Sequence, residues 1–158
     1  LSGHVRCKTD AAMRAIVDGG GTIGICCIPA FLGGSGDIRA FLDHVDYVAK
    51  KFGTQSVTIG TDRAYIPPRA NEEWGKVPGR GRRRARFESF WPPNDPLHGP
   101  DWKEERMQQS LAWTNWPLLT VGLVQRGYSD DDIRRILGEN ILRVARAAWE
   151  GRARGASG

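Results

Sequence analysis

Two residues of this sequence combine a reactive side chain with a position that could serve chemistry. Arg6 precedes a helix pattern, and its planar guanidinium can bind a carboxylate through two parallel hydrogen bonds. Asp62 directly follows a short apolar run, and the loops that follow the strands of α/β folds are where sites are built. The residue types alone leave simpler roles open: a solvated arginine ahead of a helix, and an aspartate that caps a turn.

The three histidines could suggest a metal site, because imidazole is a common zinc ligand. His44 lies in the middle of an amphipathic helix pattern, which favours a structural role, and His98 lies in an irregular segment, where we expect it to be solvated. His4 lies close to Arg6 in the sequence. We assign none of the three as a metal ligand.

The three cysteines are predicted to be free thiols. Cys7, Cys26 and Cys27 lack the C-x-x-C spacing of a zinc site, and adjacent cysteines rarely bridge each other. Free thiols favour a reducing compartment such as the cytoplasm, although the compartment itself stays unassigned.

The first part of the chain predicts helices that alternate with strands. A helix begins after Thr9 and ends at three glycines, and the apolar run Thr22–Ile28 then predicts a buried strand. A second helix begins after Asp37 and ends at Gly53, before another short strand, Ser56–Gly60. This order is typical of an α/β fold with a parallel sheet, and two strands cannot be the whole of such a sheet.

Three segments are predicted to be irregular. Residues 29–36 are rich in glycine, as phosphate-binding loops are, but they lack the lysine of such a loop. We therefore expect a strand-to-helix turn. Residues 63–103 form a long irregular loop with many prolines, glycines and arginines, and residues 151–158 form a small, basic, flexible tail.

Helical patterns return in the C-terminal part. One runs from Met107 to Val124, and the next begins after Ser129, whose hydroxyl can accept a backbone N–H. Gly138 is predicted to break that helix before a last one, from Asn140 to about Trp149. For Asn140 we expect a capping or packing role. No apolar run approaches the roughly 20 residues of a transmembrane helix.

The net charge of +5 would suit an anionic partner, but much of the excess is local. A cluster of arginines with nearby aromatic residues could track a nucleic-acid backbone while the rings stack on bases. We favour a solvated or partner-covering loop, and no nucleic-acid partner, because no helix or strand pattern presents these charges together. The cluster comprises Arg80, Arg82, Arg83, Arg84 and Arg86, with Trp74, Phe87, Phe90 and Trp91 around it.

Four strings occur in an order and at a spacing that resemble a known family. They are HVRCKTDAAMRAIVDGGGTIGI, FLDHVDYVAKKFG, SVTIGTD and PLLTVGLVQRGYSDDDIRRILGENILRV. Their succession is similar to the C-terminal part of the renal (membrane) dipeptidase family of zinc metallopeptidases. The resemblance implies that residues 1–150 are the C-terminal portion of a TIM (β/α)8 barrel with its two last strands, and that the chain continues upstream of Leu1.

The resemblance also implies a function, the zinc-dependent hydrolysis of dipeptides. Arg6 aligns with the arginine that holds the substrate carboxylate, and Asp62 with the acidic residue beside the metals and the scissile peptide. Family members often have Asp-Phe-Asp-Gly here, whereas this chain has Asp62, Arg63, Ala64 and Tyr65. The ligands of the two zinc ions are expected upstream, none in this chain, so the fragment alone is expected to be inactive.

Two alternatives remain open at this point. One is a non-catalytic binding or assembly module derived from the same family, and the other is a different metal-dependent TIM-barrel hydrolase of the amidohydrolase type. The expected partner is a dipeptide substrate. We expect no transmembrane segment in this chain, and a homodimer is left open.

Overall fold

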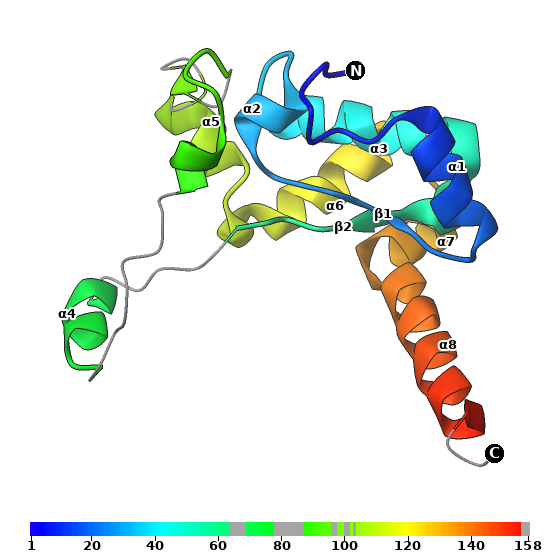
Figure 1. The fold of residues 1–158 in the computed structure, drawn as a ribbon. Helices are drawn as coiled ribbons and strands as arrows, with labels where there is room; N and C mark the ends of the chain where they lie inside the picture. Colours follow the sequence, from blue (N-terminus) through cyan, green and yellow to red (C-terminus); the bar gives the residue numbers. More distant parts are fainter. Residues whose placement is uncertain (64–68, 78–86, 96–97, 100–101, 103, 156–158) are drawn as a thin grey trace.

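The computed structural model describes residues 1–63, 69–77, 87–95, 98–99, 102 and 104–155 (Figure 1). Helices dominate, and the described residues contain one sheet of two parallel strands. The prediction of an α/β fold with parallel strands is therefore confirmed at this level. The arrangement is compatible with part of a barrel.

The first helix and strand follow the sequence pattern. Helix α1 (Asp10–Asp18) begins after Thr9, whose side-chain oxygen accepts a hydrogen bond from the N–H of Ala12. Strand β1 (Ile23–Ile25) is shorter than the predicted run. It pairs with a strand of equal length. Beyond the end of β1, the N–H of Cys27 still donates a hydrogen bond to the carbonyl of Thr61.

The segment after β1 differs from the predicted irregular turn. Residues Pro29–Leu32 form a single helical turn, α2, because proline fits the first turn of a helix, where its missing N–H is not needed. Gly33 ends this turn with φ +66°, a conformation that glycine adopts without strain. The remaining residues lead to Asp37, whose carboxylate accepts the N–H groups of Arg39 and Ala40, as predicted for a helix cap.

Helix α3 (Ile38–Phe52) connects the two strands and packs against both of them. A short 3-10 turn, Thr54–Ser56, precedes strand β2 (Val57–Ile59), and Ile23 and Ile25 of β1 lie opposite Val57 and Ile59. The buried stripe of α3 recurs at intervals of three and four residues and forms the centre of the core with the strand side chains. Its buried members are Ala40, Phe41, Leu42, Val45, Val48, Ala49 and Phe52.

The predicted loop 63–103 contains helical turns in its described part: α4 (Ala70–Gly75) and a 3-10 turn, Phe87–Phe90. Helix α4 lies apart from the rest of the molecule (Figure 1). The arginines of the predicted basic cluster, Arg80 to Arg86, lie outside the described residues.

The helix predicted from Met107 to Val124 is interrupted. Helix α5 (Glu105–Ser110) ends at Leu111, and after a 3-10 turn at Trp113–Asn115 helix α6 (Trp116–Gln125) begins. Pro117 explains the restart, because proline is tolerated in the first helical turn and not in the interior. Helix α6 packs so closely on α3 that a Cβ atom at Gly122 would lie 2.3 Å from the Cδ1 atom of Leu42.

Helix α7 (Asp130–Arg134) begins after Ser129, which accepts the N–H of Asp132 as predicted. The predicted break at Gly138 is wrong, because a π-helical turn, Arg135–Glu139, joins α7 to α8 (Asn140–Gly155) without interruption. Helix α8 projects away from the body of the molecule (Figure 1). It includes residues 151–155, which were expected in the tail, while residues 156–158 lie outside the described part.

Within the described residues, no helix is long and apolar enough to cross a membrane.

Candidate functional site

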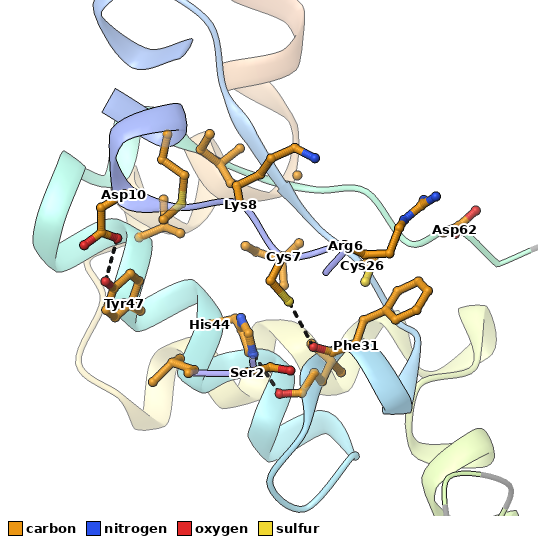
Figure 2. A pocket seen from close by; sticks show the side chains of 17 residues that line it. Ser2, Arg6, Cys7, Lys8, Asp10, Cys26, Phe31, His44, Tyr47 and Asp62 are labelled. Carbon is orange, nitrogen blue, oxygen red and sulfur yellow. Dashed lines mark hydrogen bonds between the residues drawn. The ribbon is translucent and has the colours of Figure 1, made fainter. Parts of the chain in front are cut away.

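A cavity of about 280 Å³ lies along β1, between this strand, the N-terminal segment and helices α1 and α3 (Figure 2). Its volume is just below the roughly 300–1,000 Å³ that is usual for small-molecule sites. Arg6 and Asp62, the two candidate residues predicted from the sequence, both line this cavity. They come from segments that are distant in the sequence, one ahead of α1 and the other after β2.

The guanidinium of Arg6 lies against two aromatic rings. Its guanidinium carbon lies 5.5 Å from the ring centroid of Phe31 and 5.7 Å from that of Trp91, within the range of cation–π attraction. Among the described residues, no hydrogen bond or ion pair engages this guanidinium. The five donors of Arg6 are therefore free to bind an anion in the cavity.

His4 supports Arg6 through the backbone. Its Nδ1 atom lies 3.1 Å from the N–H of Arg6 and accepts that hydrogen bond, so the ring hydrogen sits on Nε2. Nε2 then donates to Asp95 Oδ1 at 3.1 Å, and the buried ring lies 4.5 Å from that of Phe31. Both ring nitrogens are thus engaged, which fits a structural role and not the role of a metal ligand.

The aromatic support of Arg6 was not predicted from the sequence. Trp91 and Asp95 belong to the segment 63–103, and Trp91 was grouped there with the basic cluster. In the structure this tryptophan packs against His4 and Arg6 instead. No local pattern could have revealed a contact between residues 91 positions apart, such as His4 and Asp95.

Asp62 has an unusual backbone conformation. Its φ angle is +52°, and it is the only residue other than glycine with positive φ in the described part of the chain. Aspartate tolerates this left-handed region better than most residues, but such positions are uncommon and gather at functional sites. The side chain is exposed at the rim of the cavity, near Arg6 and Cys26 (Figure 2).

One comparison with known proteins identifies this part of the chain. The family model for membrane dipeptidases (peptidase family M19) matches residues 1–78. Residues 1–78 of this chain belong to the membrane dipeptidase family. We found no solved structure that matches the chain.

The dipeptidase match contains the whole cavity. It covers the segment from Leu1 through β2 and ends shortly after α4, so Arg6 and Asp62 both lie inside it. Helices α5 to α8 lie beyond the matched residues. The origin of the chain in a dipeptidase family, predicted from the four strings, is therefore confirmed over its first part.

The thiols of the dipeptidase segment are free, as predicted. Burial raises the pKa of the Cys26 thiol, and the nearby Asp62 carboxylate adds to that effect. Burial likewise raises the pKa of Cys27 to about 11. Both thiols therefore carry their protons at neutral pH, which makes them poor nucleophiles.

His44 also has a structural role, as its helix position indicated. Its Nε2 atom lies 2.9 Å from the carbonyl of Leu32, and burial lowers the pKa of the imidazole. The neutral ring donates this hydrogen bond and ties α3 to α2. His98 is half-buried and not fully solvated, and its backbone N–H donates to the carbonyl of Asp95.

The cavity does not offer the donor set that two zinc ions need. Within the described ranges, no group of three or more His, Cys, Asp or Glu residues lies close enough together to hold a metal ion. Asp62 is a suitable oxygen ligand, but His44 already donates a hydrogen bond to the carbonyl of Leu32. These residues alone do not fit a dinuclear zinc centre.

Proposed function

We propose that this chain supplies the substrate-binding and acidic corner of a zinc-dependent dipeptidase. The observation that carries the proposal is that Arg6 and Asp62, which align with two functional positions of the family, line one cavity. In this proposal the chain is the C-terminal part of a TIM barrel, with β1 and β2 as its last two strands. The zinc ligands would then lie upstream of Leu1.

Arg6 binds the free carboxylate of a dipeptide. A guanidinium can form two parallel N–H···O bonds with a carboxylate, which fixes both the position and the orientation of the substrate. The rings of Phe31 and Trp91 restrict the arginine side chain before substrate arrives. Such preorganisation lowers the entropy lost on binding and places the peptide bond in a defined position.

Asp62 acts at the other side of the cavity mouth. Its exposed carboxylate can accept a proton released in hydrolysis, or bind the ammonium group of the substrate. Its left-handed backbone conformation turns the chain three residues beyond the end of β2 and keeps the carboxylate at the cavity rim. A dipeptide would then be bound between a cation for its carboxylate and an anion for its amine.

The test is dipeptide hydrolysis with added zinc, measured for this chain and for a form extended upstream of Leu1. We expect hydrolysis in the extended form. Asp62→Asn should lower kcat there, and Arg6→Gln should raise KM by about tenfold or more, because a charged hydrogen bond contributes about 1.5–3 kcal/mol. Arg39→Gln, a change on the exposed side of α3 away from the cavity, is the matched control.

The second candidate function is a non-catalytic binding module, and the cavity itself favours it. Its free guanidinium and partly apolar wall can bind a carboxylate ligand without any reaction. Hydrolysis in neither form, together with Arg6-dependent binding of a dipeptide, would establish this candidate and overturn the dipeptidase proposal. A homodimer stays a prediction.

A further inference from the structure

Part of the environment of Arg6 comes from outside the family match. The membrane dipeptidase model covers residues 1–78. Trp91 lies beyond it, and the centroid of its ring lies 5.7 Å from the guanidinium carbon of Arg6. Asp95 belongs to the same segment and is hydrogen-bonded to the histidine that precedes Arg6 by two positions. The segment that contains Trp91 and Asp95 therefore supplies contacts that the family match does not contain.

Two hydrogen bonds join Asp95 to the backbone of Arg6 through one imidazole ring. His4 Nε2 donates to Asp95 Oδ1 at 3.1 Å, and His4 Nδ1 accepts the N–H of Arg6 at 3.1 Å. A backbone N–H can only donate and an ionised carboxylate can only accept, so both bonds need the neutral ring with its hydrogen on Nε2. Each bond therefore favours the tautomer that the other one requires.

The imidazole and the carboxylate of this connection are buried. The exposed fraction of the side chain is 1% for His4 and 7% for Asp95. A hydrogen bond is stronger away from water, and a buried polar atom that loses its partner is costly. The His4 ring also lies 4.5 Å from the ring of Phe31 and 5.7 Å from that of Trp91, measured between centroids. These contacts leave the ring one favourable orientation, in which it holds the N–H of Arg6.

Two turns hold the backbone of Asp95. Its N–H donates to the carbonyl of Pro92 at 2.9 Å, and its carbonyl accepts the N–H of His98 at 3.0 Å. The rings of Pro92 and Pro93 further restrict the φ angles of the first turn. The carboxylate of Asp95 therefore offers the His4 ring a fixed point of attachment.

The backbone and the side chain of Arg6 have different partners within the described residues. The backbone N–H is bound by His4, and the guanidinium lies against the rings of Phe31 and Trp91. A carboxylate that binds the guanidinium would thus meet a backbone and a side chain that are both positioned in advance. Such preorganisation reduces the entropy that is lost on binding.

We propose that Asp95 is a positioning residue for Arg6: it orients the buried ring of His4, and the ring fixes the backbone from which Arg6 binds a carboxylate. This inference rests on the proposed function, in which Arg6 binds the free carboxylate of a dipeptide. It adds that carboxylate recognition by this chain depends on a segment beyond the family match. Asp95 acts through His4 and does not itself contact the substrate.

The test compares the affinity of the chain for a dipeptide with its affinity for the C-terminal amide of the same dipeptide, both measured by calorimetry. We expect Asp95→Ala to weaken dipeptide binding about threefold to tenfold, as one lost hydrogen bond does, and to change amide binding by less than about twofold. Asp95→Asn keeps an oxygen that accepts from Nε2, so its dipeptide affinity should stay within about twofold of the parent. Asn94→Ala, at the exposed neighbour, is the matched control.

A measurement on the unsubstituted chain keeps the inference testable where Asp95→Ala does not fold. In nitrogen-15 NMR spectra, the shifts of the imidazole nitrogens show which of them carries the hydrogen, and a scalar coupling across the N–H···N bond reports the contact between Arg6 and His4. We expect the hydrogen on Nε2 and a detectable coupling to Nδ1. A hydrogen on Nδ1 would overturn the inference, because that nitrogen could not then accept the N–H of Arg6.

Arg6→Gln, measured in the same way, separates this inference from the proposed function. A parent chain that binds the dipeptide no more tightly than the amide would overturn both, as would an unchanged preference in Arg6→Gln. A preference that is lost in Arg6→Gln and fully kept in Asp95→Ala would overturn the inference alone. A preference that falls in both variants and is retained in Asp95→Asn supports it.

Discussion

Val57 and Gly24 lie at comparable places on opposite edges of the same two-stranded sheet, and their main-chain groups differ in what they bind. The carbonyl of Val57 is capped by the amide of Asn140, which also donates to the carbonyl of Thr54 at 2.8 Å. The main-chain groups of Gly24 face a cavity. Among the described residues, the β2 edge is therefore closed by the chain itself, and the β1 edge is open toward the cavity.

This difference divides the molecule into a structural side and a side that holds the candidate site. The structural side is built by the C-terminal helices, which lie beyond the part of the chain that matches the dipeptidase family. The other side holds the candidate site residues Arg6 and Asp62, and the cavity that they line lies within that match. Substitutions on the two sides should accordingly change different quantities: stability on one side, and ligand binding on the other.

The largest effect is expected from opening the closed edge. Asn140→Ala removes both hydrogen bonds and leaves the buried carbonyl of Val57 without a partner, which should lower the free energy of unfolding by about 1–3 kcal/mol. Urea denaturation measures the change as a lower midpoint with an unchanged slope. Glu139→Ala, at the exposed neighbour, should shift stability by less than about 0.5 kcal/mol. Equal midpoints for the two variants would show that the hydrogen bonds of Asn140 do not stabilise the β2 edge.

A smaller effect on stability is expected at Asp62, on the side that holds the candidate site. Asp62→Val places a β-branched residue at φ +52° and should cost about 1–2 kcal/mol. Asp62→Asn keeps a side chain that tolerates this conformation, so its stability should stay within about 0.5 kcal/mol of the parent while dipeptide binding weakens. Comparison of the two variants by urea denaturation and calorimetry separates the backbone role of Asp62 from the role of its charge. Large destabilisation by Asp62→Asn would show that the aspartate is structural.

The smallest effect concerns a pH-dependent contact on the closed side. Hydrogen bonds from the Thr54 and Ser129 hydroxyls hold the pKa of Asp132 below its ordinary value of 3.8. A lowered folded-state pKa means that the ionised carboxylate stabilises the fold above pH 3.8, and that this contribution is lost as the pH falls through the folded-state value. Asp132→Asn should therefore cost about 0.5 kcal/mol at neutral pH and nothing in strong acid.

The measurement for Asp132 is the unfolding midpoint of parent and variant across the acid range. The two curves should converge as the pH falls. A constant difference between them at all pH values would show that the hydrogen bonds of Asp132 do not depend on its charge.

Local patterns were enough to predict much of the fold. The caps at Thr9, Asp37 and Ser129 predicted where three helices begin. The errors arose where backbone hydrogen bonding overrides a local signal. Gly138 breaks helices in general, but a π-helical turn accommodates it here and keeps Asn140 in register with the edge of β2.

The candidate site was only partly accessible from the sequence. Arg6 and Asp62 were found through a family resemblance, since neither residue type is specific by itself. The aromatic support of Arg6 and the buried pair of His4 and Asp95 could not be predicted, because they join positions that are remote in sequence and have no periodic relation. The difference between the two sheet edges likewise depends on one long-range hydrogen-bond donor, the Asn140 side chain.

The central claim is that ligands bind on the open side of the sheet, between Arg6 and Asp62. The most direct test is an NMR titration of the isotope-labelled chain with a dipeptide and with the same dipeptide as its C-terminal amide. We predict that the free-carboxylate form shifts the resonances of Arg6, Cys26 and Asp62, leaves those of Val57 and Asn140 in place, and binds about tenfold more tightly than the amide, because a carboxylate–guanidinium pair is lost. Equal affinity for the two forms, or shifts centred on the closed edge, would contradict the account.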